Sequence, residues 1–599
     1  MFTRRQMLAS GSAAVALAAL PVRAQGNADA AAMRLLDEIA EERLAEVPGL
    51  ASSRGLDVGP RAALRGKLSD YSQAGAKRTA ETLAARLKQL DGFAGADLSR
   101  ETRRHVEVLR HAYRSGHEGL SFPYGRVSVG SWLNSPYVVI QNVGAFIDVP
   151  RLLDGSHKLE NAQDADAYLA RLGAFAGALD AETAWLQDAT AKGVIPPAFL
   201  LDKALTQLRG LQGGDPAQKA FVTKLAKAYP DRGAAAAKIA AADIMPAVGR
   251  QIAALEAQRK VAGTDAGVWK LPDGEAYYRW ALEAATTTKR TPDEVHAQGL
   301  DELKRYEAQM DALLRPLGYT KGSVGQRMAA LGRDPRFTFP EGDEGRAQIL
   351  ALAQASIDKI RPQMHRAFGR QGGGVVEIRR IPEAEELGAA GAYGGAGSKD
   401  GSVTGKFWIN LHSNSRWSKF ALPTLAYHEA IPGHVWQGEY SFDLPLVRTL
   451  LHFNGFNEGW GLYAEQLGDE LGMYEGDPVA RLGYLQSMAF RAARLVVDTG
   501  LHAKRWDRAK AVAWFGEATG SPTEEVESEI DRYCSWAGQA CGYKIGHSEI
   551  NRLRDGAKRT LGARFDLRAF NDAVVGAGWM PLAVLDTVVA EHVAARQRG

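Results

Sequence analysis

The chain has 599 residues, about twice the length at which a single hydrophobic core stops growing, so two lobes are expected. Its composition, 45% hydrophobic and 24% charged, is that of a folded globular protein and excludes a disordered one. The 73 basic residues nearly balance the 70 acidic ones. Nucleic-acid and membrane-surface binding need a basic excess, so neither partner is expected.

The first 24 residues have the pattern of an export signal. Arg4 and Arg5 precede an apolar run over residues 7–20, and a Val-Arg-Ala triplet that ends at Ala24 resembles a cleavage site. The arginine pair favours the bacterial twin-arginine route over ordinary secretion. The run is too short for a stable membrane anchor, and no cysteine follows it that could carry a lipid. We therefore expect a periplasmic protein cleaved near Ala24.

Helical patterns dominate the remaining chain. Between residues 30 and 290, apolar residues recur at intervals of three and four positions with charged residues between them. The second half shows similar patterns up to the C-terminus. We predict an N-terminal helical lobe over residues 25–290 and a C-terminal catalytic lobe over residues 291–599.

Two short segments of the second half are rich in β-branched and aromatic residues, as strands are. They are VVEIRRI, residues 375–381, and GKFWINL, residues 405–411. The glycine-rich segment between them is too long for a tight hairpin, and we expect a loop that contacts a ligand. The predicted fold is mainly α, with two helical lobes and one small sheet directly before a cluster of histidines.

That cluster lies in AYHEAIPGHVWQ, residues 426–437. Pro423 suits the first turn of a helix, so a helix that carries His428 and Glu429 is expected to start there. The stretch nearly matches H-E-x-x-H, in which two histidines four residues apart share one zinc ion. His434 comes two residues late, and on a regular helix this spacing would turn it about 120° away.

Two helix breakers lie within the spacing itself. Pro432 removes a helical hydrogen bond and Gly433 tolerates unusual dihedral angles. We therefore predict a two-residue bulge that returns the second histidine to the face of the first. In the alternative, the helix ends at the Pro-Gly pair and these histidines are ordinary partners of polar groups. The second metal ligand would then be His412 or His452.

The segment NEGWGLYAE, residues 457–465, offers a third ligand. Zinc peptidases with two histidines on one helix commonly take a glutamate from the following helix and leave one position open for water. Glu458, 24 residues after His434, is that candidate. Glu465 faces the same way and is expected to hold a ligating histidine by a hydrogen bond. The alternative of a solvated acidic face fits poorly, because aromatic residues crowd the segment.

Four segments together resemble the bacterial domain-of-unknown-function 885 family. They are HEAIPGH, FNEGWGLYAEQLG, RLVVDTGLHAKRW (494–506) and RYCSWAGQACGYKIG (532–546). Members of this family are similar in outline to helical zinc peptidases of the carboxypeptidase Taq and thimet oligopeptidase groups. The resemblance extends over nearly all of the mature chain. It departs from the family pattern at Asn571, where a histidine is expected, and at Val435, where many members have a second histidine.

The resemblance implies an exported zinc metallopeptidase that hydrolyses oligopeptides. Its expected metal ligands are His428, His434 and Glu458. Glu429 would act as the general base that activates water and then protonates the leaving amine. By analogy with helical zinc peptidases, Tyr533 or Tyr543 would donate a hydrogen bond to the oxyanion, although a packing role is open for each.

We also expect contacts with the substrate backbone. The strand over residues 405–411 would offer its edge to an extended peptide, and Tyr393 in the glycine-rich loop would close over that peptide. Farther along, residues 494, 498 and 502 share one helical face. Arg494, Asp498 and His502 would orient a metal ligand or bind a substrate carboxylate, or form a buried structural ion network, which is the interpretation we favour.

Two other functions fit the same residues. An amidase acting on cell-wall peptides would share the chemistry and differ only in its cleft. A non-catalytic peptide-binding protein would keep the fold, but it would not need Glu429. The two cysteines, Cys534 and Cys541, would lie about 10.5 Å apart along one unbroken helix, too far for a disulfide. They could pair only if the chain bends near Ala537-Gly538, and we expect free thiols. The oligomeric state does not follow from the sequence.

Overall fold

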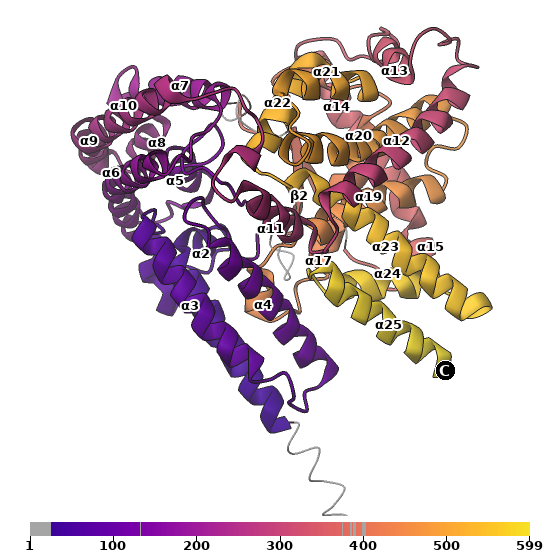
Figure 1. Cartoon of the computed structure of the whole chain (residues 1–599), viewed down its shortest axis with the longest axis horizontal. Coiled ribbons are helices and arrows are strands. Elements are labelled where there is room, and N and C mark those ends of the chain that lie inside the picture. Colours follow the sequence, from indigo (N-terminus) through magenta and orange to yellow (C-terminus); the bar gives the residue numbers. More distant parts are fainter. Residues whose placement is uncertain are drawn as a thin grey trace, which may run out of the picture.

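The computed structural model describes residues 26–131, 133–373, 375–383, 386, 391–397 and 403–598. The predicted export signal, residues 1–24, lies outside the described residues. Helices make up most of the structure, and the sheet has three short strands (Figure 1). The predicted mainly α fold with a small sheet is therefore confirmed.

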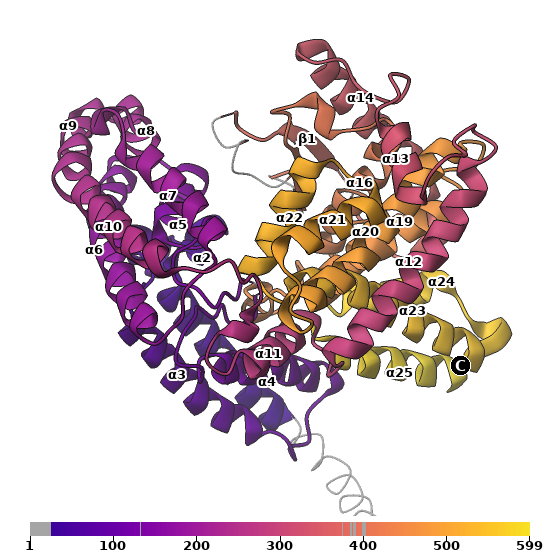
Figure 2. The same ribbon diagram turned by 45° about the horizontal axis from the view of Figure 1, so that its top comes forward.

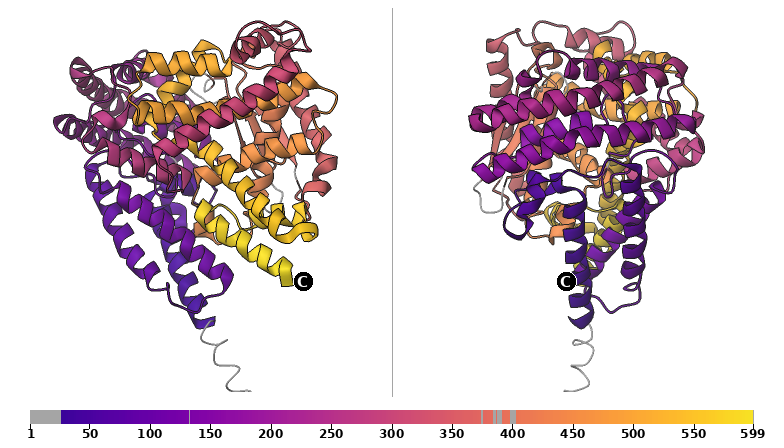
Figure 3. Two further views of the ribbon diagram at one scale, coloured as in Figure 1. Left: turned by 45° about the vertical axis from the view of Figure 1, so that its right-hand side comes forward. Right: turned by 90° about the vertical axis from the view of Figure 1, so that its left-hand side faces the viewer.

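A helix over residues 26–46 opens the described chain. The helices that follow it in the first half are α2 (Pro48–Ser53), α3 (Gln73–Asp91), α4 (Arg100–Gly119), α5 (Ala145–Arg151), α6 (Ala162–Ala191), α7 (Ala198–Gln212), α8 (Ala220–Ala228), α9 (Pro230–Ile239), α10 (Met245–Val261) and α11 (Gly274–Thr286). The long helices α3 and α4 pack side by side (Figure 3).

The second half begins with α12 (Pro292–Leu314), whose N-terminus has a capping box between Thr291 and Glu294. The other helices are α13 (Val324–Gly332), α14 (Asp343–Ile360), α15 (Met364–Ala367), α16 (Leu422–Glu429), α17 (His434–Glu439), α18 (Leu446–Thr449), α19 (Asn454–Glu470), α20 (Pro478–His502), α21 (Arg508–Thr519), α22 (Thr523–Ser535), α23 (Gln539–Leu561), α24 (Leu567–Gly576) and α25 (Leu582–Arg598). Cys534 in α22 and Cys541 in α23 are buried free thiols, as predicted.

The two halves form two groups of helices that stand side by side, with α11 between them (Figure 2). Helix α11 packs against α4 of the first group and against α19 and α23 of the second. The buried side chains of one hydrophobic core all lie within residues 138–255. A larger core joins the helix over residues 26–46 to helices as far along the chain as α25. The division at residue 290 falls between α11 and α12 and stays a prediction.

The sheet has the strand order β1-β3-β2. Strand β1 (Val376–Arg380) pairs parallel with β3 (Gly405–Ile409), and β2 (Ala392–Gly395) pairs antiparallel with β3 on its other side. The prediction that the strand over 405–411 presents an edge to a peptide is therefore wrong, because both edges of β3 are already paired. The glycine-rich segment, predicted as a loop throughout, contains β2.

A close backbone contact explains why that strand is rich in glycine. A Cβ atom on Gly394 would lie 2.2 Å from the carbonyl oxygen of Glu429, so a larger residue would force β2 away from α16. Glycine has a low strand propensity, and the sequence therefore reads as a loop. Packing against α16 outweighs this propensity and places β2 beside the predicted catalytic glutamate.

Helices α19 and α23 approach each other through facing glycines. A Cβ atom on Gly546 would lie 1.7 Å from the carbonyl oxygen of Gly455, and one on Gly459 would lie 2.5 Å from the carbonyl carbon of Gly546. These contacts are between backbone atoms, which cannot move aside as a flexible side chain can. The glycines thus fix α19, which carries Glu458, against α23.

Gly546→Ala should lower the stability by about 1–3 kcal/mol, the usual cost of overpacking a tight contact. Gly556→Ala is the matched control on the same helix, because its added Cβ would meet only the end of the Arg559 side chain at 3.9 Å. Replacing this partly exposed helical glycine should be neutral or stabilise by up to about 1 kcal/mol. Thermal unfolding followed by circular dichroism measures both variants, and equal melting temperatures would contradict the packing argument.

Candidate metal centre

The histidine motif spans two short helices. Helix α16 runs from Leu422 to Glu429 with Pro423 in its first turn, so the predicted start is confirmed. It ends at Glu429, and α17 begins at His434. The predicted two-residue bulge is wrong in form, because the helix is interrupted, but its predicted result is confirmed: the rings of His428 and His434 lie side by side, with centroids 4.9 Å apart. The helix stops before the Pro-Gly pair and a new one starts at the second histidine.

Contacts with neighbouring backbone hold the break between the two helices. The indole nitrogen of Trp460 in α19 donates to the Pro432 carbonyl oxygen at 2.9 Å. A Cβ atom on Gly433 would lie 1.7 Å from the His428 carbonyl oxygen, so only glycine fits at this position. The chain thus folds back tightly on the end of α16, and this return brings the second histidine beside the first.

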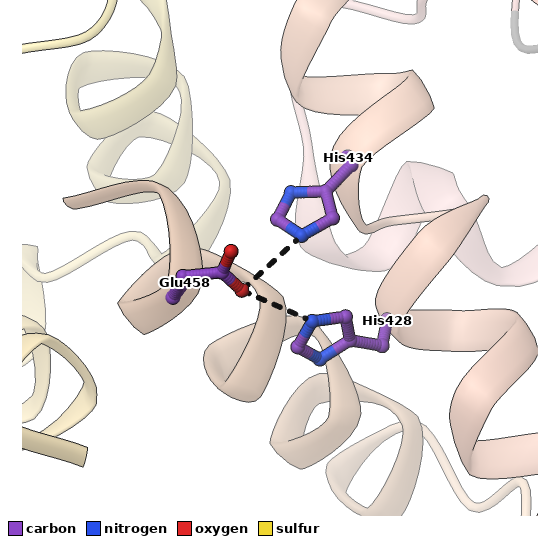
Figure 4. Close-up of side chains that lie close together, drawn as sticks. All are labelled: His428, His434 and Glu458. Carbon is purple, nitrogen blue, oxygen red and sulfur yellow. Dashed lines mark ion pairs between the residues drawn. The ribbon is translucent and has the colours of Figure 1, made fainter. Parts of the chain in front are cut away.

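His428, His434 and Glu458 converge on one point (Figure 4). The Glu458 Oε2 atom lies 3.5 Å from His428 Nε2 and 3.6 Å from His434 Nε2. One donor atom from each residue lies within 4.8 Å of the other two. A tetrahedral zinc ion with ligands at about 2.0–2.1 Å holds them about 3.3 Å apart, so the three residues fit such an ion.

Charge at this point is concentrated away from water. Burial alone would lower the pKa of His428, but hydrogen bonds to Glu458 and Glu465 outweigh burial and raise it to about 9. Burial would raise the pKa of Glu458, yet His428 and His434 hold it well below its usual range. The three residues therefore favour a positive charge between them, whether a proton or a metal cation.

His428 is held from behind. Its Nδ1 atom lies 2.7 Å from Oε1 of Glu465, which is 1% exposed. A carboxylate only accepts, so Nδ1 carries a proton, and Nε2 is the nitrogen that faces Glu458 and could bind a metal ion. A Cβ atom on Gly461 would lie 2.5 Å from the imidazole, so this glycine lets the ring rest against α19. Glu465 stands where the sequence analysis expected it.

Glu429 lies next to the ligand cluster and is 7% exposed. Its Oε2 atom is buried and has no hydrogen-bond partner among the described residues. A buried carboxylate oxygen without a partner is costly, and such an atom calls for an explanation. This oxygen is therefore available to accept a hydrogen bond or a proton from a molecule bound at the cluster.

The two predicted tyrosines differ in their surroundings. The Tyr533 hydroxyl is buried, donates to Glu529 at 2.6 Å and accepts from Arg494 at 2.9 Å. Tyr543 is partly exposed, and its hydroxyl has no hydrogen-bond partner among the described residues. Burial and the negative charge of Glu458 raise the pKa of Tyr543, which places its ring near the cluster. Of the two tyrosines, Tyr543 therefore has the hydroxyl group that is free to bind a ligand at the cluster.

Residues 494, 498 and 502 do not form one network. Arg494 pairs with Glu529 at 2.8 Å. Asp498 accepts from the Tyr278 hydroxyl at 2.7 Å and from a backbone N–H, and burial raises its pKa to about 7. His502 contacts two backbone groups. Asp498 and His502 thus bind neutral partners, and the favoured interpretation of a shared ion network is wrong for both.

The remaining candidates lie outside the cluster. Tyr393 belongs to β2, where it stacks on Trp408 with ring centroids 6.2 Å apart and is 44% exposed. His412 is exposed, and His452 contacts the side-chain amide of Asn457. In the part of the chain that the structure describes, the only group of this kind that could hold a metal ion comprises His428, His434 and Glu458.

Sequence reasoning missed two residues that continue the support of His428. The Ser487 hydroxyl donates to Glu465 at 2.5 Å, and Arg491 donates to Ser487 at 2.8 Å. With Arg494, they recur at intervals of four and three residues on α20, and this spacing could have indicated a common face. No motif marks either residue.

None of the helices in the described ranges is long and apolar enough to cross a membrane.

A protein from Colwellia psychrerythraea, described provisionally as a lipoprotein, has a similar crystal structure, with a TM-score of 0.89 and 31% identity over 95% of this chain and 100% of that one. A second such protein, from Shewanella oneidensis and of unknown function, shares the fold with a TM-score of 0.70 and 18% identity over 93% and 99% of the chains.

No curated protein matches the sequence. A family model, described as bacterial protein of unknown function (DUF885), matches residues 48–589, which include both helices of the histidine motif and Glu458. This match and the Colwellia structure, each over most of the chain, agree with the resemblance found in the sequence. The chain belongs to the DUF885 family.

Proposed function

We propose that the protein is a zinc-dependent peptidase that hydrolyses peptide bonds of oligopeptides. One observation carries the proposal: a buried glutamate oxygen without a partner, on Glu429, lies beside three converging metal-type donors. A site that only bound a metal would not need this carboxylate. A glutamate next to a ligating histidine is the arrangement in which zinc peptidases place their general base.

His428, His434 and Glu458 would hold the ion. Two imidazoles and one carboxylate are a donor set typical of catalytic zinc, which leaves one position for water or substrate. Bound there, zinc would lower the pKa of a water ligand towards neutrality and polarise a carbonyl group. Glu465 would keep His428 in the tautomer that can ligate, because it accepts the Nδ1 proton.

Glu429 and Tyr543 would carry out the proton and charge steps. The free Oε2 atom of Glu429 would take a proton from the attacking water and pass it to the amine that leaves. The Tyr543 hydroxyl would donate a hydrogen bond to the negative oxygen that forms from the carbonyl. Tyr533 cannot serve in this way without giving up its contacts with Glu529 and Arg494.

We further propose that the protein acts outside the cytoplasm, in the periplasm. Residues 1–24 have the pattern of an export signal, with an arginine pair and an apolar run. The Colwellia protein, 31% identical over 95% of this chain, is described provisionally as a lipoprotein, a class of exported proteins. Peptides in that compartment are the substrates that fit this location.

Purified protein should contain about one zinc ion per chain. His428→Ala, His434→Ala and Glu458→Ala should each lose most of it, because each removes one of three donors. His412→Ala is the control, since this exposed histidine lies outside the cluster. Metal analysis after dialysis gives the stoichiometry. A full zinc complement in His434→Ala would show that the second helix supplies no ligand.

Glu429→Gln should reduce peptide hydrolysis by about 10²-fold or more and leave the zinc content unchanged, because it removes the base and no donor. Exposed Glu475→Gln makes the same chemical change on the surface and should keep full activity. Initial rates on a peptide mixture, with and without a chelator, test both variants. Near-normal hydrolysis by Glu429→Gln would exclude its role as the base.

Tyr543→Phe should lower kcat by about 10²–10³-fold, the usual effect of removing one oxyanion donor, with little change in KM. Tyr533→Phe should mainly lower the melting temperature, because it leaves Glu529 and Arg494 with one hydrogen bond fewer. Steady-state kinetics and thermal unfolding of both variants separate the roles. The opposite pattern would assign the oxyanion donor to Tyr533.

A further inference from the structure

One side of α20 brings positive charge towards the metal centre. Arg494 is 7% exposed, and its Nη1 atom is buried without a hydrogen-bond partner among the described residues. Several other arginines leave only the inner Nε unpartnered, but Arg494 is the only one in the described ranges with a buried, unpartnered terminal Nη. A buried guanidinium N–H without an acceptor is costly, which points to an acceptor that arrives from outside.

Direct contacts link this side of α20 to the metal ligands. Arg491 reaches His428 through the hydrogen bonds of Ser487 and Glu465. The Arg494 guanidinium stands over the Tyr543 ring, 4.4 Å from its centroid. Burial and the negative charge of Glu458 raise the pKa of Tyr543, and the positive charge of Arg494 opposes them. Arg494 therefore stands beside the tyrosine proposed as the oxyanion donor, and Arg491 is linked to His428 on the Nδ1 side of its ring.

Acidic residues do not balance these arginines. Arg494 shares its acidic partner, Glu529, with Arg532, which lies 2.9 Å from the same carboxylate. Arg491 donates hydrogen bonds to the backbone and side-chain oxygens of Ser487, a neutral residue. Glu525, on α22, lies within electrostatic reach of Arg491 and Arg494 but is exposed and forms no ion pair in the described structure. The three guanidinium groups of Arg491, Arg494 and Arg532 thus outnumber the carboxylates of Glu525 and Glu529 by one.

We propose that Arg491 and Arg494 bind the α-carboxylate at the C-terminus of the substrate peptide. The planar guanidinium fork matches a carboxylate, and binding would supply both the missing acceptor for Arg494 and the missing negative charge. Every unmodified peptide carries this group, whatever its sequence. The inference rests on the proposed peptidase function and deepens it, because it makes the enzyme selective for bonds near a free C-terminus.

Binding tests the inference without turnover. The Glu429→Gln protein is titrated by calorimetry with three pentapeptides: an alanine peptide with a free C-terminus, its C-terminal amide, and an amide with glutamate as the last residue. We expect amidation to weaken binding by about 10- to 100-fold, the effect of losing hydrogen bonds to a charged group. Adding Arg491→Gln or Arg494→Gln should make the free acid bind as weakly as the amide.

Arg481→Gln is the matched control. It removes a guanidinium from the same helix, but one that is exposed and paired with Asp469. This variant should keep the full preference for the free acid. Arg491 is only partly buried, so its variant should fold even where loss of Arg494 does not, and zinc content and circular dichroism check both.

Each remaining outcome is decisive. Equal binding of free acid and amide by the Glu429→Gln protein would overturn the inference, as would a preference that survives both arginine changes. If the glutamate amide binds as tightly as the free acid, the arginines recognise a side-chain carboxylate and the terminal assignment is wrong. If the free acid is preferred but the unaltered protein hydrolyses no peptide, the carboxylate site stands and the proposed peptidase function fails.

Discussion

The Glu458 carboxylate holds together two imidazoles that come from separate helices. Its Oε2 atom is 3.5 Å from His428 and 3.6 Å from His434, at the ends of α16 and α17 that face each other across the break. The three groups are largely shielded from water, so no one of them would be stable in its charged form alone. Much of the surrounding structure serves to bring these three side chains to one point.

Close backbone approaches do most of that positioning. Gly433 turns the chain against the end of α16, Gly461 admits the His428 ring, and Gly459 lets α19 press against α23. None of these glycines has a positive φ, so they are required for space and not for conformation. The centre is thus built from helices that touch at their backbones, which leaves the donor atoms little freedom to move.

Local sequence patterns predicted the metal-type donor residues better than the helices and strands that surround them. The spacing of His428 and His434 and the glutamate at 458 identified the cluster, because histidine and glutamate side chains are common zinc ligands and can be recognised by residue type alone. A hydrogen bond from Trp460 holds the break between α16 and α17. Trp460 is distant in sequence, so the local pattern indicates a bulge and not two separate helices. Strand β2 was missed because its glycines are selected by packing on α16 and not by strand propensity. Pairing order in a sheet is a tertiary property, and the edge was assigned to the wrong strand for that reason.

One buried ion pair away from the metal centre, between Lys544 and Glu302, is fully satisfied, and this contrast bears on function. Lys544 and Glu302 pair at 2.7 Å with side chains that are 1% and 8% exposed, and further hydrogen bonds occupy the carboxylate. A fully satisfied pair of this kind needs nothing from outside and is structural. Around the metal centre, by contrast, Glu429 and Arg494 each keep one buried polar atom without a partner. One is an acceptor beside the metal ligands and the other a donor over the Tyr543 ring. In the proposed reaction, the attacking water brings the proton that Glu429 accepts and the peptide brings the carboxylate that Arg494 binds, so hydrolysis of one peptide explains both open positions.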